Sequence, residues 1–279
     1  MDAKILTIKK KNILQISKYL DYRSCINLTY TNKTIKSHLR NNLINIFDTQ
    51  YLQLSNKDLN KYKSKDNLIY EILNKKNLKE NISIIKIQFE TTLKNSDLYP
   101  ISKYNNLKEI IINGCHGIND DYFKLFKNEL KITLLELYWM PQIKDIAQFL
   151  SIINKELLIY LNLSGCKNLL KENFNLILEF SNLESLDLTR CTSLTDDIIY
   201  LISKKNKNIK KLILYAIPYL NGNFLSNLSN KLESLDICGN QVIVDHDICS
   251  LKSQIIKHIN LVSLDYNYVI KINSLGAIN

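Results

Sequence analysis

A short hydrophobic phrase recurs along the chain at a nearly constant spacing. In its frame, L-x-x-L-x-L, Leu or Ile occupies the first, fourth and sixth places. The clear copies begin at Leu107, Leu158, Leu183, Ile209 and Leu232, and the weaker ones at Ile82, Leu134 and Leu261. The seven steps from 82 to 261 average roughly 26 residues, and a fixed period in this range indicates a stacked array of repeats.

Each copy predicts a short strand, because alternate apolar positions suit a strand with one buried face. Cys115, Cys166 and Cys191 follow their copies at the same offset, where the chain leaves the strand and a small buried side chain fits. Residues 119–121 (Asn-Asp-Asp) and 195–197 (Thr-Asp-Asp) then precede apolar runs, as helix N-termini favour. The predicted unit is therefore strand, turn and helix.

Stacking such units predicts an α/β solenoid with a parallel sheet on its concave face, because no single repeat buries its own apolar side. Residues 82–279 hold about eight repeats in this interpretation. Over roughly 82–275 the sequence resembles leucine-rich repeat proteins of the cysteine-containing subclass. The copy at Leu134 departs from the pattern, with Trp139 in a core slot and Gln142 in place of Cys, and predicts a bulge or altered turn there.

Composition narrows the class of protein. The 279 residues contain no apolar run long enough for a membrane helix, and the N-terminus lacks a secretory signal, so we expect a protein of the cytoplasm or the nucleus. The six cysteines are then interpreted as reduced thiols, although a disulfide between stacked repeats stays conceivable. Their spacing does not suit a metal site.

The formal net charge of +10 permits a nucleic-acid or acidic partner, but the basic runs are typical of solvated surfaces, so nucleic acid is not favoured. No phosphate-loop, nucleophile-elbow or zinc-protease motif occurs, and the four histidines are dispersed. We therefore expect a non-catalytic protein with no cofactor and no metal.

The repeats do not reach the N-terminus. Residues 12–40 contain three short apolar runs at helical spacing, separated by polar breaks, and predict a small helical unit over 1–42. Residues 43–81 predict a helical linker or N-terminal cap that packs on the first repeat.

Residues 13–28 and 31–35 resemble an F-box. They match the family's first helix ending in Tyr19-Leu20, a short polar loop and a second leucine-rich helix, while Lys9 and Ile35 replace the family's proline and tryptophan. The resemblance implies binding to the Skp adaptor of a cullin–RING ubiquitin ligase, with the repeats holding a protein substrate. The adaptor contacts that it implies are Ile8, Leu14, Ile16, Leu20, Cys25, Ile26 and Leu28.

Substrate contacts are expected on the exposed side of the strands, between and after the buried places of the frame. The candidates are Glu136, Tyr138, Met140, Tyr160, Asn162, Asp187, Thr189, Arg190, Lys211, Tyr215, Asp236 and Asp265. The three Asp residues share one offset from their starts and predict an acidic stripe that suits a basic target segment, although each alone is also an ordinary surface residue.

Three hypotheses follow from the sequence. The first is a substrate receptor of a ubiquitin ligase, and the second is a leucine-rich repeat scaffold for protein interactions, with its N-terminal helices acting as a cap. The third is a basic protein that associates with nucleic acid.

Overall fold

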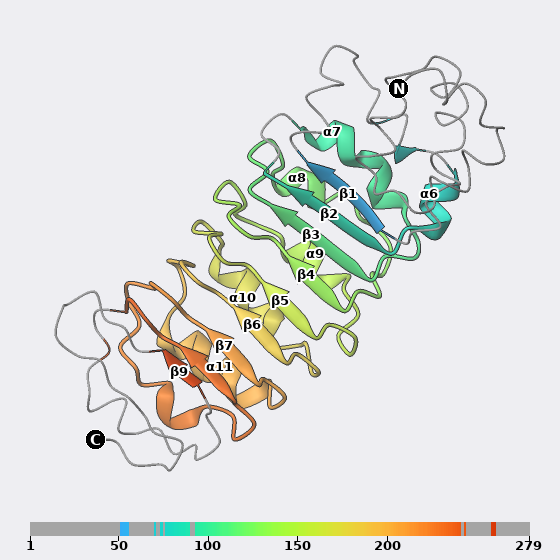
Figure 1. The fold of residues 1–279 in the computed structure, drawn as a ribbon. Coiled ribbons are helices and arrows are strands. Elements are labelled where there is room, and N and C mark those ends of the chain that lie inside the picture. The colour runs from blue at the N-terminus through green and yellow to red at the C-terminus, as the bar shows by residue number, and fades with distance from the viewer. Residues whose placement is uncertain are drawn as a thin grey trace, which may run out of the picture.

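The computed structural model describes residues 51–55, 70, 73–74, 76–89, 93–240, 243 and 258–260. The described strands form one nine-stranded parallel sheet, whose strand order follows the chain (Figure 1). The described strands are β1 (Tyr51–Ser55), β2 (Ile84–Gln88), β3 (Glu109–Asn113), β4 (Leu134–Glu136), β5 (Tyr160–Asn162), β6 (Ser185–Asp187), β7 (Lys211–Ile213), β8 (Ser234–Asp236) and β9 (His258–Asn260).

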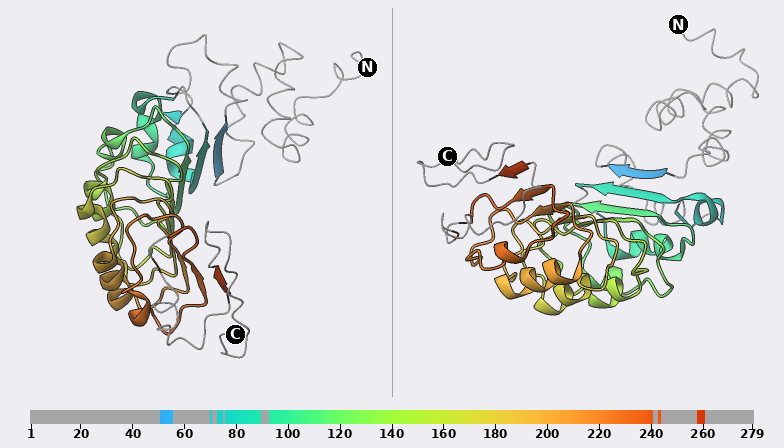
Figure 2. Two further views of the ribbon diagram at one scale, coloured as in Figure 1. Left: turned by 90° about the vertical axis from the view of Figure 1, so that its left-hand side faces the viewer. Right: turned by 90° about the horizontal axis from the view of Figure 1, so that it is seen from below.

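Short helices connect most of the strands. They are α6 (Lys76–Asn81), α7 (Asn95–Leu98), α8 (Asp120–Phe123), α9 (Ala147–Ser151), α10 (Lys171–Ile177) and α11 (Asp196–Lys205), with 3-10 helices η2 (Tyr99–Lys103) and η3 (Leu225–Asn227). Figure 2 shows a curved body with the strands on its inner side and helices on its outer side. This is the predicted leucine-rich repeat solenoid. Within the described residues, no helix is long and apolar enough to cross a membrane.

The hydrophobic frame forms the core. Position n denotes here the nth residue after the first residue of a frame. The residues at position 3 lie opposite one another in the sheet register, as Ile110 pairs with Leu135 and Leu135 with Leu161. These side chains are at most 1% exposed. Burying a Leu or Ile side chain contributes about 1.5–3 kcal/mol, so this shared row holds neighbouring repeats together.

The register corrects the repeat that was expected to begin at Leu134. Because Leu135 lies in the position 3 row, the frame begins at Ile132, two residues earlier. The cysteine position then holds Met140, which is fully buried, and Trp139 stands at the partly exposed position 7. Placing Trp139 in the core and Gln142 in the cysteine slot was therefore wrong.

The last frame is also corrected. Ile259 pairs with Leu235, so the frame begins at residue 256. Leu261 therefore occupies the third apolar place of the frame, not the first. Asp236 pairs with Asn260. Asp265 was therefore wrongly expected to stand at the same position as the other two acids. Asp265 itself lies outside the described residues.

The sheet begins earlier in the chain than expected. β1 lies within the stretch 43–81 that predicted only helices, and it pairs with β2 along its whole length. Its Leu52 packs against the core. α6 follows in the same stretch. The F-box-like residues, including all seven predicted adaptor contacts, lie outside the described residues.

Side chains at position 8 link consecutive repeats. Cys166 Sγ donates to the Leu137 carbonyl at 2.9 Å, and Asn240 Nδ2 donates to the Leu214 carbonyl at 2.8 Å. Both acceptors stand at position 5 of the preceding repeat, so Cys and Asn serve one purpose. Cys115, Cys166 and Cys191 are buried thiols outside any disulfide, as the sequence predicted, and burial raises the pKa of Cys166 to about 12. Such a thiol is inert.

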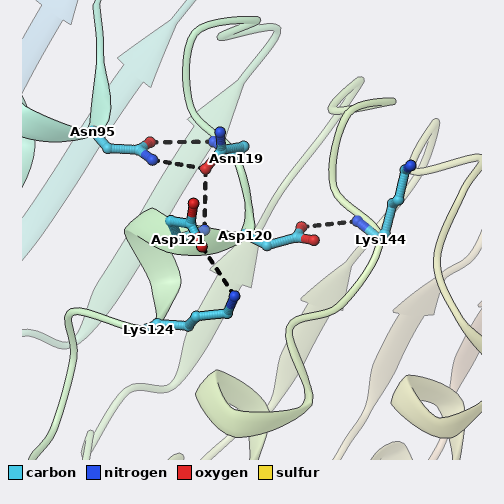
Figure 3. A network of polar contacts seen from close by, with 6 residues as sticks. All are labelled: Asn95, Asn119, Asp120, Asp121, Lys124 and Lys144. Atoms are coloured by element: carbon cyan, nitrogen blue, oxygen red, sulfur yellow. Dashed lines mark hydrogen bonds and ion pairs between the residues drawn. The ribbon is translucent and has the colours of Figure 1, made fainter.

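Polar groups at the helix N-termini add a second set of links between repeats (Figure 3). Asn119 caps α8 by accepting from the Asp121 N–H at 3.0 Å, as predicted, and it also pairs with Asn95 of the preceding repeat. Asp120 Oδ1 accepts from the Lys144 N–H of the following repeat at 2.8 Å. The outer side is therefore held by hydrogen bonds that span three repeats.

Two glycines at position 7 provide a matched test of how closely consecutive repeats pack where the strands end. A Cβ at Gly165 would lie 3.0 Å from the Trp139 Cα, whereas one at Gly239 would meet its nearest neighbour at 3.4 Å. Both residues have a positive φ, so Ala costs about 1 kcal/mol at either site. We expect Gly165→Ala to lower the free energy of unfolding, measured in urea, by about 1–2 kcal/mol more than Gly239→Ala. Equal losses would show that the backbone yields at Gly165.

Candidate functional site

The concave face of the sheet is built from the positions between the buried rows. Because side chains alternate along a strand, positions 2, 4 and 6 point away from the core. The register aligns position 4 across the sheet as Lys86, Ile111, Glu136, Asn162, Asp187, Ile213, Asp236 and Asn260. One continuous surface therefore crosses the repeats from β2 to β8.

Most of the predicted substrate contacts that the structure describes lie on this surface. Position 2 contains Tyr160 and Lys211, position 4 contains Glu136, Asn162, Asp187 and Asp236, position 6 contains Tyr138, Thr189 and Tyr215, and position 7 contains Arg190. Met140 is the exception, because it is fully buried at position 8. Its expected exposure followed from the misplaced frame.

The acids of position 4 have a structural task. Asp187 Oδ1 accepts from the Thr189 N–H at 2.9 Å, and Asp236 Oδ1 accepts from the Cys238 N–H at 3.0 Å. Asn162 makes the same bond to the Ser164 N–H. These bonds shape the turns that end β5, β6 and β8, and a neutral amide makes them as well as a carboxylate does. Ile213 stands between the two acids, so the predicted stripe is not continuous.

The surroundings of Asp187 disfavour its charge. Partial burial raises the pKa of this carboxyl, and the neighbouring Asp236 adds to the effect. The hydrogen bonds from Thr189 and the charge of Lys211 oppose it. The carboxylate therefore keeps its charge at a cost in stability.

Position 7 forms an edge that the sequence did not predict. Seven consecutive repeats have a positive φ there, at Phe89, Gly114, Trp139, Gly165, Arg190, Ala216 and Gly239. Only glycine adopts this conformation freely, and any other residue costs about 1–2 kcal/mol. The signal was present as an alternation of large and small residues, but the misplaced frame at Leu134 concealed it.

The large side chains of this edge contact one another across repeats. The Arg190 Cζ lies 5.5 Å from the Trp139 ring centroid and 5.8 Å from that of Tyr215. Lys167 Nζ lies 5.5 Å from the Trp139 centroid. These cation–π contacts hold planar groups in a row at the rim of the concave face.

The remaining chemistry is sparse. In the described part of the chain, no group of three or more His, Cys, Asp or Glu residues could hold a metal ion. A hollow of about 70 Å³ beside Tyr104 and another beside Lys155 are lined by loops that precede strands, not by the concave surface. Of the histidines, His116 is exposed in a turn and His258 begins β9, while His38 and His246 lie outside the described residues.

These features define the class of the protein as a leucine-rich repeat solenoid. The fold is similar to a chain in the crystal structure of the Rad7 and Elc1 complex in yeast, with a TM-score of 0.56 and 19% sequence identity. The match covers 75% of this chain and 54% of that one, so this chain spans about half the length of its structural neighbour. At this identity the likeness shows the fold alone. No family model and no curated protein matches the sequence.

The raised pKa of Asp187 predicts that the stability of the wild type and of an Asn variant will differ with pH. Because the pKa of Asp187 is raised in the folded state, its favourable contribution is present below its ordinary pKa, near 4, and is lost as pH rises through the folded value. Asp187→Asn keeps the turn bond and does not titrate. We expect its free energy of unfolding, relative to the wild type, to increase between about pH 3 and pH 7.

A second variant separates the turn bond from the charge. Asp187→Ala removes the acceptor and, like Asp187→Asn, does not titrate, so it should be about 1 kcal/mol less stable than Asp187→Asn at either pH. The same urea titrations compare the three proteins. A pH-independent difference between Asp187→Asn and the wild type would contradict this account of the charge.

Proposed function

We propose that this protein is the substrate-recognition subunit of a cullin–RING ubiquitin ligase. In this proposal the N-terminal residues bind a Skp-type adaptor, which connects to a cullin, and the concave face binds the target protein. The observation that carries the proposal is the pairing of an F-box-like sequence with a solenoid whose concave rows present aromatic and charged side chains.

The composition of the surface supports protein binding. Tyr138 is 38% exposed at position 6, Tyr215 is partly exposed in the same row, and Tyr160 is partly exposed at position 2. Tyrosine is enriched in protein interfaces because its ring offers apolar area and its hydroxyl offers a hydrogen bond. The structural neighbour comes from a complex of Rad7 with Elc1, so a similar fold occurs within a two-protein assembly.

The expected mechanism is positional. The chain would hold the target close to a ubiquitin-loaded enzyme, and the gain in rate would come from proximity and orientation, with no bond chemistry in this subunit. A rigid solenoid suits this task, because its buried rows and inter-repeat bonds fix the distance between its two ends.

The alternative function is a protein-interaction scaffold without ubiquitin transfer. The same concave surface supports it, and the N-terminal residues would then shield the first strand as a cap. The two functions differ in one property, which is binding to the adaptor.

Capture of purified full-length protein by an immobilised Skp-type adaptor tests this difference. We expect the wild type to bind and Leu14→Asp with Leu20→Asp to lose binding at least about tenfold, because charge at an apolar contact leaves a desolvated carboxylate. The control is Asp187→Asn with Asp236→Asn, which changes the concave face and preserves its turn bonds. Failure of the wild type to bind would leave the scaffold function.

A further inference from the structure

The rim where the strands end has the properties of a peptide-binding surface. We call it the strand-exit edge, and its described residues are 88–89, 113–117, 138–142, 164–168, 189–193, 215–219 and 238–240. We propose that it binds an extended segment of the partner protein, with one acidic side chain at Arg190 and Lys167 and apolar side chains on the neighbouring rings. The proposal rests on the proposed function in one respect, that the occupant is a protein.

Several large side chains of the edge stand on a strained backbone without a structural need. Gly114, Gly165 and Gly239 show that glycine satisfies the backbone at position 7. Phe89, Trp139 and Arg190 adopt the same conformation at a cost that the fold does not require. Strained residues that the surrounding structure maintains are concentrated at binding sites, which motivates a functional role for these side chains.

The spacing of the large side chains along the edge suits an extended segment. The Phe89 ring lies against Gly114 and the Trp139 ring against Gly165, so the large side chains stand two repeats apart. Two strand spacings are about 9.5 Å. An extended polyproline-type segment advances about 9.3 Å in three residues. Side chains three residues apart on such a segment therefore reach successive large side chains of the edge.

The strand-exit edge is positively charged. The described edge contains Lys167 and Arg190 but no Asp or Glu, which suits an acidic ligand. The guanidinium of Arg190 is already oriented between Trp139 and Tyr215, so little side-chain entropy is lost when it pairs with a carboxylate.

Acidic side chains close to the strand-exit edge disfavour a nucleic acid. Glu136, Asp187 and Asp236 stand at position 4, two residues before position 6 and hence about 7 Å from the edge along each strand. A single strand would bring a phosphate for every base against two cations and this row of acids. A protein segment with one acid avoids that repulsion.

The test measures fluorescence anisotropy of a short labelled proline-rich peptide with one central glutamate and a leucine three residues to either side. Versions with glutamine or lysine at the centre vary only the charge, and labelled oligothymidylate represents nucleic acid. Trp139 is the sole tryptophan of the chain, so its emission reports independently on contact at the edge.

We expect the glutamate peptide to bind and to change Trp139 emission, the glutamine peptide to bind about three- to tenfold more weakly, and the lysine peptide weaker still. Arg190→Gln should remove the preference for glutamate. Trp139→Gly should weaken binding at least about tenfold without lowering the urea midpoint of unfolding, because glycine relieves the positive φ. Tyr200→Ala, on the outer helix α11, is the matched control and should change nothing.

Three results would overturn the inference: equal binding of the glutamate and lysine peptides, unchanged binding by Trp139→Gly, or tighter, steeply salt-dependent binding of oligothymidylate. Adaptor capture on the same preparations separates this inference from the proposed function. Capture without peptide binding would remove only the strand-exit edge as a site, whereas peptide binding without capture would favour the scaffold.

Discussion

The whole structure depends on stacking, because a single repeat of this chain has no interior of its own. The buried side chains of each strand pack against those of the preceding strand, and the register must keep the position 3 residues opposite one another. A slip of one residue would turn every buried Leu to the solvent. The hydrogen bonds from position 8 to the preceding repeat reinforce the same register, since their donors reach only a carbonyl in the correct place.

This constraint divides the residues of the concave face into two kinds. Asn162, Asp187 and Asp236 look like ligands in the sequence, yet each accepts a backbone N–H that shapes the following turn. A carboxylate at such a place reflects folding at least as much as recognition. The side chains at position 7 are different, because the turn fixes only the left-handed backbone there, and residues as different as Gly, Ala, Phe, Trp and Arg adopt it. Their identity is therefore available for recognition.

The sequence predicted the repeats in which Leu or Ile clearly occupies all three apolar places of the frame. The frames at Leu158 and Leu183 agree with the register, and so do the helix starts at residues 120 and 196. The frame at Leu134 failed because Leu134 and Leu137 also have an L-x-x-L spacing, although Ile132, Leu135 and Leu137 fill the whole frame, and the pairing with β3 and β5 identifies Ile132 as the start. β1 was missed since a strand of five residues with two leucines resembles one turn of an amphipathic helix.

The left-handed backbone of the strand-exit edge could not be predicted, for a further physical reason. The sign of φ is a backbone property, and Trp139 or Arg190 carries no local signal for a left-handed conformation, whereas Gly165 and Gly239 do. The conformation is imposed by the turn that joins each strand to the buried side chain at position 8. Every repeat must make this turn, so the cost of the left-handed residue is similar for all non-glycine side chains. Substitutions at position 7 can therefore change which ligand the edge binds, while the packing of the core stays the same.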